Sequence, residues 1–387
     1  MKTVDLIYFN AGGGHRAAAL ALEQAMAWRP WRVRLVNLTE MLDPQGLFRR
    51  LTGVEPEDIY NWHLASGFTL GLKQQLKVMQ GLIRLSHNTL VQRLQSHWRK
   101  TGPDLVVSLI PNFNRALCES LVSVLPGVPY VTVLTDMADH PPNFWIEPGL
   151  AQQHVVCGTT HAVTQALAAG CAPERVHRTS GMILRPSFYE SSTLDRRAER
   201  RALGLDPQQP TGLVLFGGRG TRAMKLVVDR LPDTPLILLC GHNRPLAKEL
   251  RAMPARSPRV VMEFTPDVAR WMRLADFFIG KPGPGSLSEA VHMGLPVIVL
   301  RNARTMPQER WNTEWVRALD VGVVYSRYQG LRVAVDEALA RLPELRANVQ
   351  RVHNRAVFEV PQILERLLDQ ADRRPRPYPV APELSPS

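Results

Sequence analysis

Short apolar runs alternate with amphipathic stretches along most of the chain. In the first half, each apolar run is of strand length and is followed by a turn and by residues with helical spacing. Nearly all-apolar strands that alternate with helices are typical of a parallel sheet covered on both faces. The strands expected here are Val4–Phe9, Val33–Leu38, Leu105–Leu109, Tyr130–Leu134 and His154–Cys157, and the helices are Gly14–Trp28, Asn112–Val124 and Thr159–Ala169.

The alternation stops near Pro186 and begins again after Pro210. The pattern therefore predicts two doubly wound α/β domains, residues 1–185 and 186–345, with ligands at the carboxyl ends of the strands in the cleft between them. Residues 346–372 are expected to form a final helix broken at Pro361, and the Pro-rich tail 373–387 to be disordered. The strands expected in the second half are Leu213–Phe216, Leu236–Cys240, Val260–Met262, Phe277–Ile279, Val297–Leu300 and Val321–Tyr325.

The charge balance points to anionic partners. The 387 residues include 47 Lys and Arg against 35 Asp and Glu, a net charge of +12. Such a protein favours nucleic acid, phosphorylated substrates or anionic lipid. The cluster Arg196, Arg197, Arg200 and Arg201 is interrupted by acidic residues and is interpreted as a solvated linker helix. No basic run is interleaved with stacking aromatics, so a nucleic-acid partner is the least supported of the three.

Targeting and membrane-spanning segments are not expected. The first ten residues contain Asp5 and lead directly into a glycine-rich turn, unlike a signal peptide. No window of about 20 residues is continuously apolar, as a transmembrane helix would require. The four cysteines are scattered without a CxxC pair, which disfavours a metal cluster or a disulfide scaffold and fits a reducing cytoplasm.

Glycine-rich turns follow three of the expected strands, and the first runs from Asn10 to His15. Glycines let the backbone approach a ligand, and the free N–H groups that open the next helix favour an anion. His15 is expected at this helix N-terminus, where a neutral imidazole suits a base or a hydrogen-bond partner. A tight turn with a structural histidine is the alternative.

The second turn, residues 216–221, is suited to a diphosphate. Its backbone N–H groups and the Thr221 hydroxyl are candidate donors, and Arg219 or Arg222 would add positive charge. The turn lacks the GK[ST] sequence of an ATPase loop, so nucleotide hydrolysis is disfavoured.

The third turn, residues 280–289, opens a helix that Gly285 and Ser286 are expected to cap. Glu289 lies one helical turn further on the same face, where a carboxylate can accept both hydroxyls of a ribose. A simple capping box is the alternative reading of Ser286 and Glu289.

Together these segments resemble motifs of the GT-B glycosyltransferases of family 28, and within it the galactolipid synthases and processive diacylglycerol glucosyltransferases. The most specific match is FIGKPGPG at residues 278–285, which continues to Pro296. The matching segments run from residue 9 to about residue 326. The others are GGGHRA at residues 12–17, the pair Thr135-Asp136 with Trp145 nine residues on, GMILRPSF at residues 181–188 and CGHN at residues 240–243.

The resemblance implies a GT-B fold, two Rossmann-like domains facing across a cleft, with the C-terminal helix returning to the first domain. It also implies an inverting transfer from a UDP-sugar that needs no metal or other cofactor. His15 and Asp136 would deprotonate or orient the acceptor hydroxyl, and Gly13, Gly14 and Trp145 would contact the acceptor. The implied donor contacts are Gly217, Gly218, Gly220, Thr221, Gly283, Gly285 and Ser286 for the diphosphate, Glu289 for the ribose, His242, Asn243 and Phe264 for the uracil, and Gln308, Glu309 and Asn312 for the sugar.

Two departures from the family pattern leave the donor sugar open. His242 replaces the common Arg, and the segment around Gln308 and Glu309 lacks the usual glycines. Glucose, galactose and N-acetylglucosamine all remain candidates.

Residues 59–103 contain no acidic residue and carry a net charge of +6 from Lys73, Lys77, Arg84, Arg93, Arg99 and Lys100. Apolar residues from Leu72 to Trp98 recur at helical spacing beside this charge. A basic amphipathic segment of this kind suits an anionic membrane surface, and the insertion in the resembled family helps to bind membrane and lipid. An ordinary helix that packs its apolar face on the sheet is the alternative.

The sequence thus favours a peripheral-membrane glycolipid synthase on the cytoplasmic face of the cell membrane, which transfers a hexose from a UDP-sugar to diacylglycerol. Three alternatives stay open. They are transfer to another acceptor such as a polyprenyl-linked cell-wall precursor, a UDP-sugar epimerase of the same architecture, and a nucleotide-sugar sensor without turnover.

Overall fold

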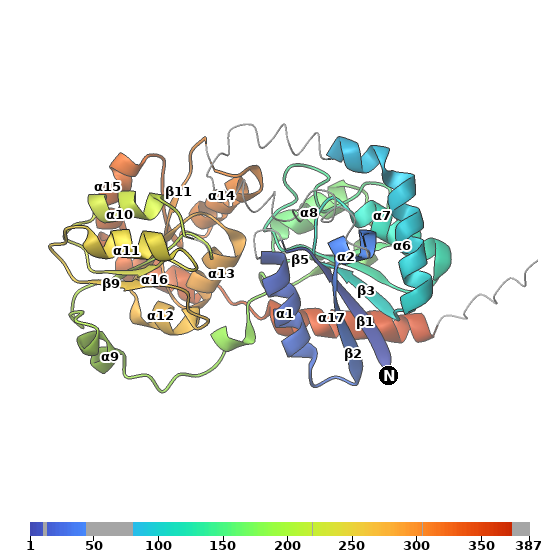
Figure 1. The fold of residues 1–387 in the computed structure, drawn as a ribbon, viewed down its shortest axis with the longest axis horizontal. Coiled ribbons are helices and arrows are strands. Elements are labelled where there is room, and N and C mark those ends of the chain that lie inside the picture. The colour runs from blue at the N-terminus through green and yellow to red at the C-terminus, as the bar shows by residue number, and fades with distance from the viewer. Residues whose placement is uncertain (11–13, 44–79, 219, 304, 374–387) are drawn as a thin grey trace, which may run out of the picture.

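The computed structural model describes residues 1–10, 14–43, 80–218, 220–303 and 305–373. Within these ranges the chain forms two domains, each with a parallel six-stranded sheet (Figure 1). The first sheet has the order β2-β1-β3-β4-β5-β6, and the second has the order β12-β11-β10-β7-β8-β9. The expected α/β class with two doubly wound sheets is confirmed.

The strands of the first sheet are β1 (Lys2–Tyr8), β2 (Trp31–Asn37), β3 (Leu105–Ser108), β4 (Tyr130–Val133), β5 (Gln153–Cys157) and β6 (Val176–Arg178). Helices on its two faces are α1 (Gly14–Met26), α2 (Leu38–Leu42), α6 (His87–Thr101), α7 (Asn114–Val124) and α8 (Thr160–Ala168). The sequence pattern missed β6, because this edge strand is three residues long and reads Val-His-Arg rather than as an apolar run.

The strands of the second sheet are β7 (Gly212–Leu215), β8 (Leu236–Leu239), β9 (Arg259–Met262), β10 (Phe277–Gly280), β11 (Val297–Leu300) and β12 (Gly322–Tyr325). The central strands β7, β8, β10 and β11 are buried along their whole length, as strands covered on both faces must be. The helices of this half are α9 (Arg196–Ala202), α10 (Ala223–Arg230), α11 (Arg244–Ala252), α12 (Val268–Leu274), α13 (Pro284–His292), α14 (Arg310–Ala318), α15 (Leu331–Ala340) and α16 (Leu342–Gln350).

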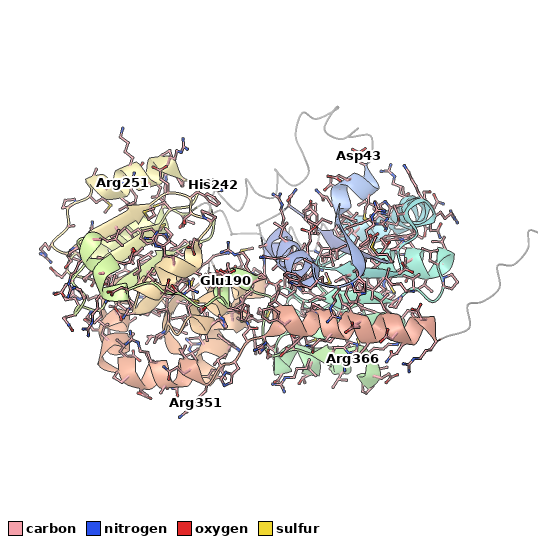
Figure 2. The ribbon with its side chains drawn as sticks, turned by 90° about the horizontal axis from the view of Figure 1, so that it is seen from below. Asp43, Glu190, His242, Arg251, Arg351 and Arg366 are labelled. Carbon is pink, nitrogen blue, oxygen red and sulfur yellow. The ribbon has the colours of Figure 1, made fainter. Side chains whose placement is uncertain are left out.

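The last helix, α17 (Ala356–Asp372), returns to the first domain and lies against α1, as Figures 1 and 2 show. The expectation of one helix from residue 346 that breaks at Pro361 is wrong. The chain instead turns between α16 and α17, where the Asn354 side chain accepts from Ala356 N at 3.1 Å and donates to Met182 O at 2.9 Å. Helix α17 runs through Pro361, because its buried apolar face outweighs the single missing N–H donor.

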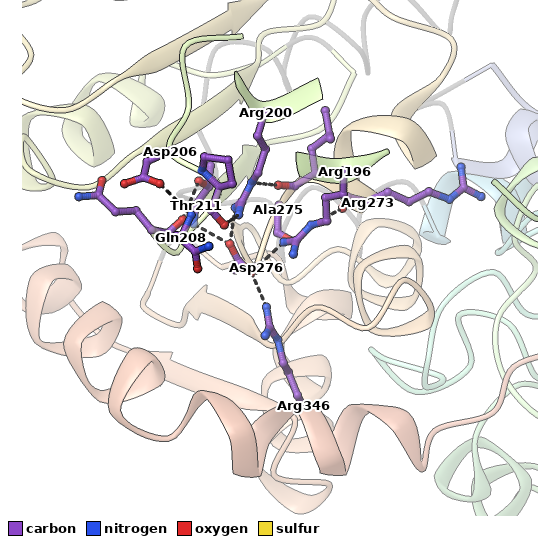
Figure 3. Close-up of polar contacts among 12 residues, drawn as sticks. Arg196, Arg200, Asp206, Gln208, Thr211, Arg273, Ala275, Asp276 and Arg346 are labelled. Atoms are coloured by element: carbon purple, nitrogen blue, oxygen red, sulfur yellow. Dashed lines mark hydrogen bonds and ion pairs between the residues drawn. The ribbon is translucent and has the colours of Figure 1, made fainter. Parts of the chain in front are cut away.

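Within the second domain, the helices next to the two connections, α9 and α16, are tied together by one buried carboxylate, that of Asp276 (Figure 3). Its oxygens accept from Arg196 and Arg200 of α9, from Arg346 of α16, and from Thr211 N at 2.9 Å. Burial opposes ionisation of this group, but the arginines beside it hold its pKa below the usual range. The interpretation of this cluster as solvated is therefore wrong for Arg200, which is buried and helps to neutralise a carboxylate distant in sequence. Arg197 and Arg201 are exposed, and the Arg196 side chain is 40% exposed although it also meets Asp276.

The basic segment is described only from residue 80 onward, so Lys73 and Lys77 lie outside the described residues. In α6 the apolar face packs on α7: Leu94 and Trp98 are buried, and the Trp98 indole donates to Ser120 Oγ at 2.9 Å. For this helix the ordinary packing role is confirmed. Just before it, Leu82 is 59% exposed and Leu85 is 85% exposed. None of the helices in the described ranges has the length and apolarity to cross a membrane.

Candidate functional site

A cleft of about 2390 Å³ lies between the two domains, at the carboxyl ends of both sheets. Its walls are the turns that follow the strands, as expected for doubly wound folds. Thr135 and Asp136, after β4, stand on the side of the first domain. Residues 216–218, after β7, and Lys281, after β10, stand on the side of the second domain.

His15 occupies the first turn of α1 and lines the cleft. Its Nδ1 lies 3.1 Å from the Thr135 hydroxyl, and its ring packs 5.8 Å from the Trp145 ring. Burial lowers the pKa of His15 to about 4, so the imidazole is neutral near pH 7. Gly14 begins the helix and lines the cleft, whereas Gly13 lies outside the described residues.

Asp136 stands beside His15 on the same wall. Its Oδ2 accepts the Trp145 indole N–H at 2.9 Å, and the side chain is 9% exposed. Burial raises the pKa of Asp136 to about 7; the Trp145 bond opposes this shift, and the negative charge of Glu309 adds to it. The carboxyl group therefore gains and loses its proton near neutral pH.

Trp145 is fully buried behind Asp136 and does not line the cleft. The loop that carries it is held by Asp139, whose carboxylate accepts from Asn143 N and Phe144 N at 3.0 Å and from Trp145 N at 2.6 Å. Trp145 thus supports Asp136 and His15, and its implied acceptor contact stays a prediction. Asp139 was not among the expected residues, because no motif marks a carboxylate that caps its own loop.

On the opposite wall, the segment between β7 and α10 is described at residues 216–218 and 220–222, and the Gly220 N–H donates to Gly217 O at 3.1 Å. Arg219 lies outside the described residues. Gly217 and Gly220 have φ of +76° and +54°, conformations that favour glycine. A Cβ at Gly220 would also meet Cys240 O at 2.8 Å. Gly218 lies between them on the cleft wall, and the Thr221 hydroxyl accepts from Ala223 N at 3.2 Å at the start of α10. At these glycines the backbone can approach a ligand without obstruction by a side chain.

The turn after β10 leads into α13, whose N-terminus points into the cleft. The helix begins at Pro284 with Gly283 as its N-cap, so the expected cap by Gly285 and Ser286 is wrong. Proline is favoured at the first helical position because its missing N–H needs no partner there. The helix therefore starts at Pro284, and the residue before it, Gly283, is the cap. Gly285 and Ser286 lie in the first turn and line the cleft.

Glu289, one turn deeper in α13, also lines the cleft. Burial raises its pKa to about 7, and Arg185, whose Nη2 lies 3.9 Å from Glu289 Oε1, opposes the shift. Arg185 comes from the segment between the two domains and donates to Pro266 O at 3.0 Å. The motif around residues 181–188 contained this arginine, but its partner could not be read from the sequence.

Lys281 and Glu309 form an ion pair in the middle of the cleft, with Nζ 2.6 Å from Oε1. The Lys281 side chain passes between the two glycine turns: its Cε would lie 3.9 Å from a Cβ at Gly217 and 3.3 Å from one at Gly283. Burial lowers the pKa of Lys281, but Glu309 and Asp136 together raise it above its usual value. Lys281 is therefore a fixed cation between two turns rich in N–H donors.

Gln308 and Asn312 flank Glu309 in sequence but differ in position. Gln308 lines the cleft, and its buried Oε1 has no hydrogen-bond donor among the described residues. Asn312 is fully buried and donates to Pro282 O at 2.7 Å, which fixes the turn before α13. Gln308 is thus placed to contact a ligand, and Asn312 to hold the turn.

The three residues implied at the nucleobase lie together at one end of the cleft. The rings of His242 and Phe264 stack at 4.1 Å with an interplanar angle of 16°, and Phe264 is 55% exposed. The Asn243 side chain accepts from Leu246 N at 3.0 Å and caps α11. The stacked pair offers an aromatic surface, whereas the Asn243 oxygen is already engaged.

In the described ranges, no group of three or more His, Cys, Asp or Glu side chains is placed to hold a metal ion. Positive charge in the cleft comes from the N-termini of α1, α10 and α13 and from six side chains: Arg16, Arg93, Arg185, Arg222, Lys225 and Lys281.

Comparison with known proteins supports the resemblance found in the sequence. No protein-family model matches the chain. It is 26% identical over 331 residues to a probable monogalactosyldiacylglycerol synthase 2, chloroplastic, of Oryza sativa subsp. indica, covering 77% of this chain and 66% of that protein. It is 25% identical over 348 residues to monogalactosyldiacylglycerol synthase 1, chloroplastic, of Arabidopsis thaliana, covering 81% and 60%. The chain thus spans somewhat less than two thirds of these relatives' length.

Solved structures confirm the GT-B fold. MurG of Acinetobacter baumannii is 12% identical with a TM-score of 0.56, covering 95% of this chain and 100% of that one. S. aureus MnaA, solved with UDP, is 14% identical with a TM-score of 0.58, covering 98% and 100%. The glycosyltransferase VinC, solved with dTDP, is 15% identical with a TM-score of 0.58, covering 95% and 100%.

Proposed function

We propose that the chain is a glycosyltransferase that moves a hexose from a UDP-sugar to a membrane lipid, with diacylglycerol as the acceptor. The observation that carries the proposal is the arrangement of the cleft. One wall offers two glycine turns, a lysine and the N-termini of two helices, which suits a diphosphate. The other wall places Asp136 beside His15. The similarity to monogalactosyldiacylglycerol synthases supports both the donor class and the lipid acceptor.

In this proposal the nucleoside diphosphate lies along the second domain. Glu289 accepts the ribose hydroxyls, and Arg185 keeps its carboxylate oriented. The diphosphate lies between the N-terminus of α13 and the turn residues Gly217, Gly218, Gly220 and Thr221, where backbone N–H groups and Lys281 meet it. The uracil lies against the stacked rings of His242 and Phe264.

The donor sugar points toward the first domain and is read by Gln308 and Glu309. Gln308 brings a buried oxygen without a donor, which a sugar hydroxyl would satisfy. Glu309 gains a hydroxyl donor when the diphosphate draws Lys281 away from it. Asn312 acts indirectly, by fixing the turn at Pro282.

Asp136 is the preferred general base. A carboxylate with a pKa of about 7 is a stronger base than an imidazole with a pKa of about 4, which leaves His15 to orient the acceptor hydroxyl. The acceptor oxygen attacks the anomeric carbon as its proton passes to Asp136, and the bond to the UDP oxygen breaks on the opposite face. A single displacement of this kind inverts the anomeric centre. Lys281 and the helix N-termini stabilise the departing diphosphate, which removes the need for a metal ion.

The acceptor enters along the first domain, where apolar side chains line part of the cleft. Phe9, Leu38, Leu42, Ile110 and Phe113 line this end. Gln80 donates to Asn112 Oδ1 at 3.0 Å on the same wall, so the exposed Leu82, Leu85 and Arg84 stand next to the entrance. Exposed leucines beside a basic residue suit the surface of an anionic bilayer, and we propose that the protein meets the cytoplasmic face of the cell membrane there.

Acceptor exchange tests the proposal. Release of UDP from a panel of UDP-sugars is measured on anionic vesicles that contain diacylglycerol, a polyprenyl phosphate, or neither. The proposal expects release that depends on diacylglycerol. Release only with the polyprenyl carrier would replace the acceptor, and conversion of UDP-N-acetylglucosamine without an acceptor would identify an epimerase. UDP binding without any turnover would identify a sensor.

A further inference from the structure

The ring of His161 stacks on the ring of Trp311 across the gap between the domains. The centroids lie 4.5 Å apart and the ring planes differ by 8°. His161 belongs to α8 of the first domain, and Trp311 to the first turn of α14 of the second. Aromatic rings in parallel contact at this distance contribute a direct attraction, so the pair stabilises the closed arrangement of the two domains.

Two methionines add to this contact, because each packs in the apolar cluster of the opposite domain. Met306 of the second domain is 8% exposed and packs in the apolar cluster of the first domain, with Leu134 and Phe144. Met137 of the first domain is 1% exposed and belongs to the apolar cluster of the second. Methionine fills such irregular spaces readily, and each of these residues would be exposed if the domains separated.

These contacts enclose the segment proposed to read the donor sugar. Gln308 and Glu309 lie between Met306 and Trp311 in the short 3-10 helix Pro307–Glu309. Both ends of this segment are therefore held by the first domain, although the segment belongs to the second.

The same helix α8 is bound to the loop that carries Asp136. The Thr159 hydroxyl, which caps α8, donates to Met137 O at 2.6 Å. Gln165 of α8 accepts from Asp139 N at 2.8 Å and donates to Asp139 O at 3.0 Å. His161 thus stands on a helix fixed to the base, and it touches the helix that follows the sugar-reading pair.

We propose that His161 is a positioning residue for the donor sugar, which holds Gln308 and Glu309 through Trp311 when the domains are closed. The inference rests on the proposed function and adds a coupling to it: the sugar pocket is complete only when the acceptor domain is docked. UDP, which contacts the second domain alone, does not depend on the stack. A UDP-sugar does, because its apparent affinity scales with the fraction of molecules in the closed arrangement.

Binding of UDP and of the preferred UDP-sugar is measured by calorimetry on the full chain, as wild type, His161→Ala and His161→Phe. The sugar nucleotide is used without acceptor, so that no turnover occurs. His161→Ala is expected to weaken UDP-sugar binding about 2- to 10-fold, the range of one aromatic pair, and to leave UDP binding within about twofold. His161→Phe keeps a flat ring and is expected to restore wild-type affinity for both ligands.

The matched control is His177→Ala, which removes another stacked histidine, on His154, from within the first domain. It is expected to change neither affinity. Equal loss of UDP and UDP-sugar binding in His161→Ala would show a general structural defect, and unchanged binding of both would show that the stack does not position the segment. Either result overturns the inference. Failure of the wild type to bind UDP would instead contradict the proposed function.

Discussion

The indole N–H of Trp145 donates to Oδ2 of Asp136 at 2.9 Å, inside a pocket that leaves the carboxyl group 9% exposed. The bond engages one oxygen of the carboxyl group and aims the group at the cleft. Burial raises its pKa more than this single bond lowers it, so the pKa stands at about 7. Burial thus disfavours ionisation of this carboxyl group at the position where the reaction needs a proton acceptor.

Replacing Asp136 with Asn is expected to slow turnover strongly but to stabilise the protein at alkaline pH. The folded state holds the Asp136 proton up to about pH 7, while the unfolded state releases it near the ordinary value of 3.8. Stability therefore falls as the pH rises through this window, and Asn removes that loss. Turnover should drop at least about 100-fold, with UDP affinity unchanged. Thermal unfolding should show a higher Tm than wild type at about pH 8 and no gain at about pH 4.

Asp139→Ala is the comparison for that variant. It removes the acceptor of three backbone N–H groups whatever the charge of the carboxyl group and should lower Tm at both pH values. If Asp136→Asn destabilised the protein at pH 8 as well, the buried carboxyl group would not be the source of the pH dependence.

Replacing Lys281 with Gln is expected to weaken UDP binding about 10-fold or more, the loss of one charged hydrogen bond to the diphosphate. Part of the effect should appear as a weaker dependence of UDP affinity on salt, because a cation has been removed from the site. Calorimetry over a range of salt concentrations measures both. Lys248→Gln, at an exposed position on α11 outside the cleft, is the control and should bind UDP as wild type does. The same affinity in both variants would rule out a diphosphate contact for Lys281.

Glu289→Gln should lower affinity for UDP more than affinity for 2′-deoxy-UDP. Removing the hydroxyl that donates to a charged acceptor lowers the affinity for the ligand about 10- to 100-fold. The losses from Glu289→Gln and from the missing 2′-hydroxyl should not add if both remove the same hydrogen bond. The measurement is best made near pH 8, because burial holds the pKa of Glu289 at about 7. Strictly additive losses would place the ribose elsewhere.

Asp276→Asn tests how much the carboxylate that ties α9 to α16 contributes to stability. The change leaves three arginines facing one another without their counter-charge and should cost about 3–5 kcal/mol in the free energy of unfolding. Asp229→Asn, which breaks a single exposed pair with Arg230, should have no measurable effect. Denaturant unfolding of both variants measures the difference. Equal stabilities would show that the contacts of Asp276 do not stabilise this domain.

Much of the fold could be predicted from the sequence, because the features that determine the fold are local. The apolar run of Phe277–Ile279 and the glycines after it mark a buried strand and a turn without reference to any other segment. The position of Glu289 followed from the same pattern, since parallel strands bring their carboxyl ends to one edge. Asp136 was expected at the site only because of the resemblance to the family.

The rest depends on partners that are distant in the chain. The ion pair with Glu309 fixes the position of Lys281, and the ion pairs with Asp276 fix those of Arg196 and Arg200. None of these pairings has a sequence signature. The break after α16 was missed for the same reason, because Asn354 makes its bond to Met182 from the other connection between the domains. Trp145 was placed near the site by its motif, but only the packing shows that it stands behind Asp136 rather than in the cleft.

The most direct test of the central claim is product analysis by mass spectrometry after incubation with UDP-glucose, UDP-galactose or UDP-N-acetylglucosamine on anionic vesicles that contain diacylglycerol. The account predicts a glycosyldiacylglycerol with at least one of these donors, formed together with UDP and strongly reduced with Asp136→Asn. No sugar-bearing lipid with any donor, from a wild-type protein that binds UDP, would contradict it.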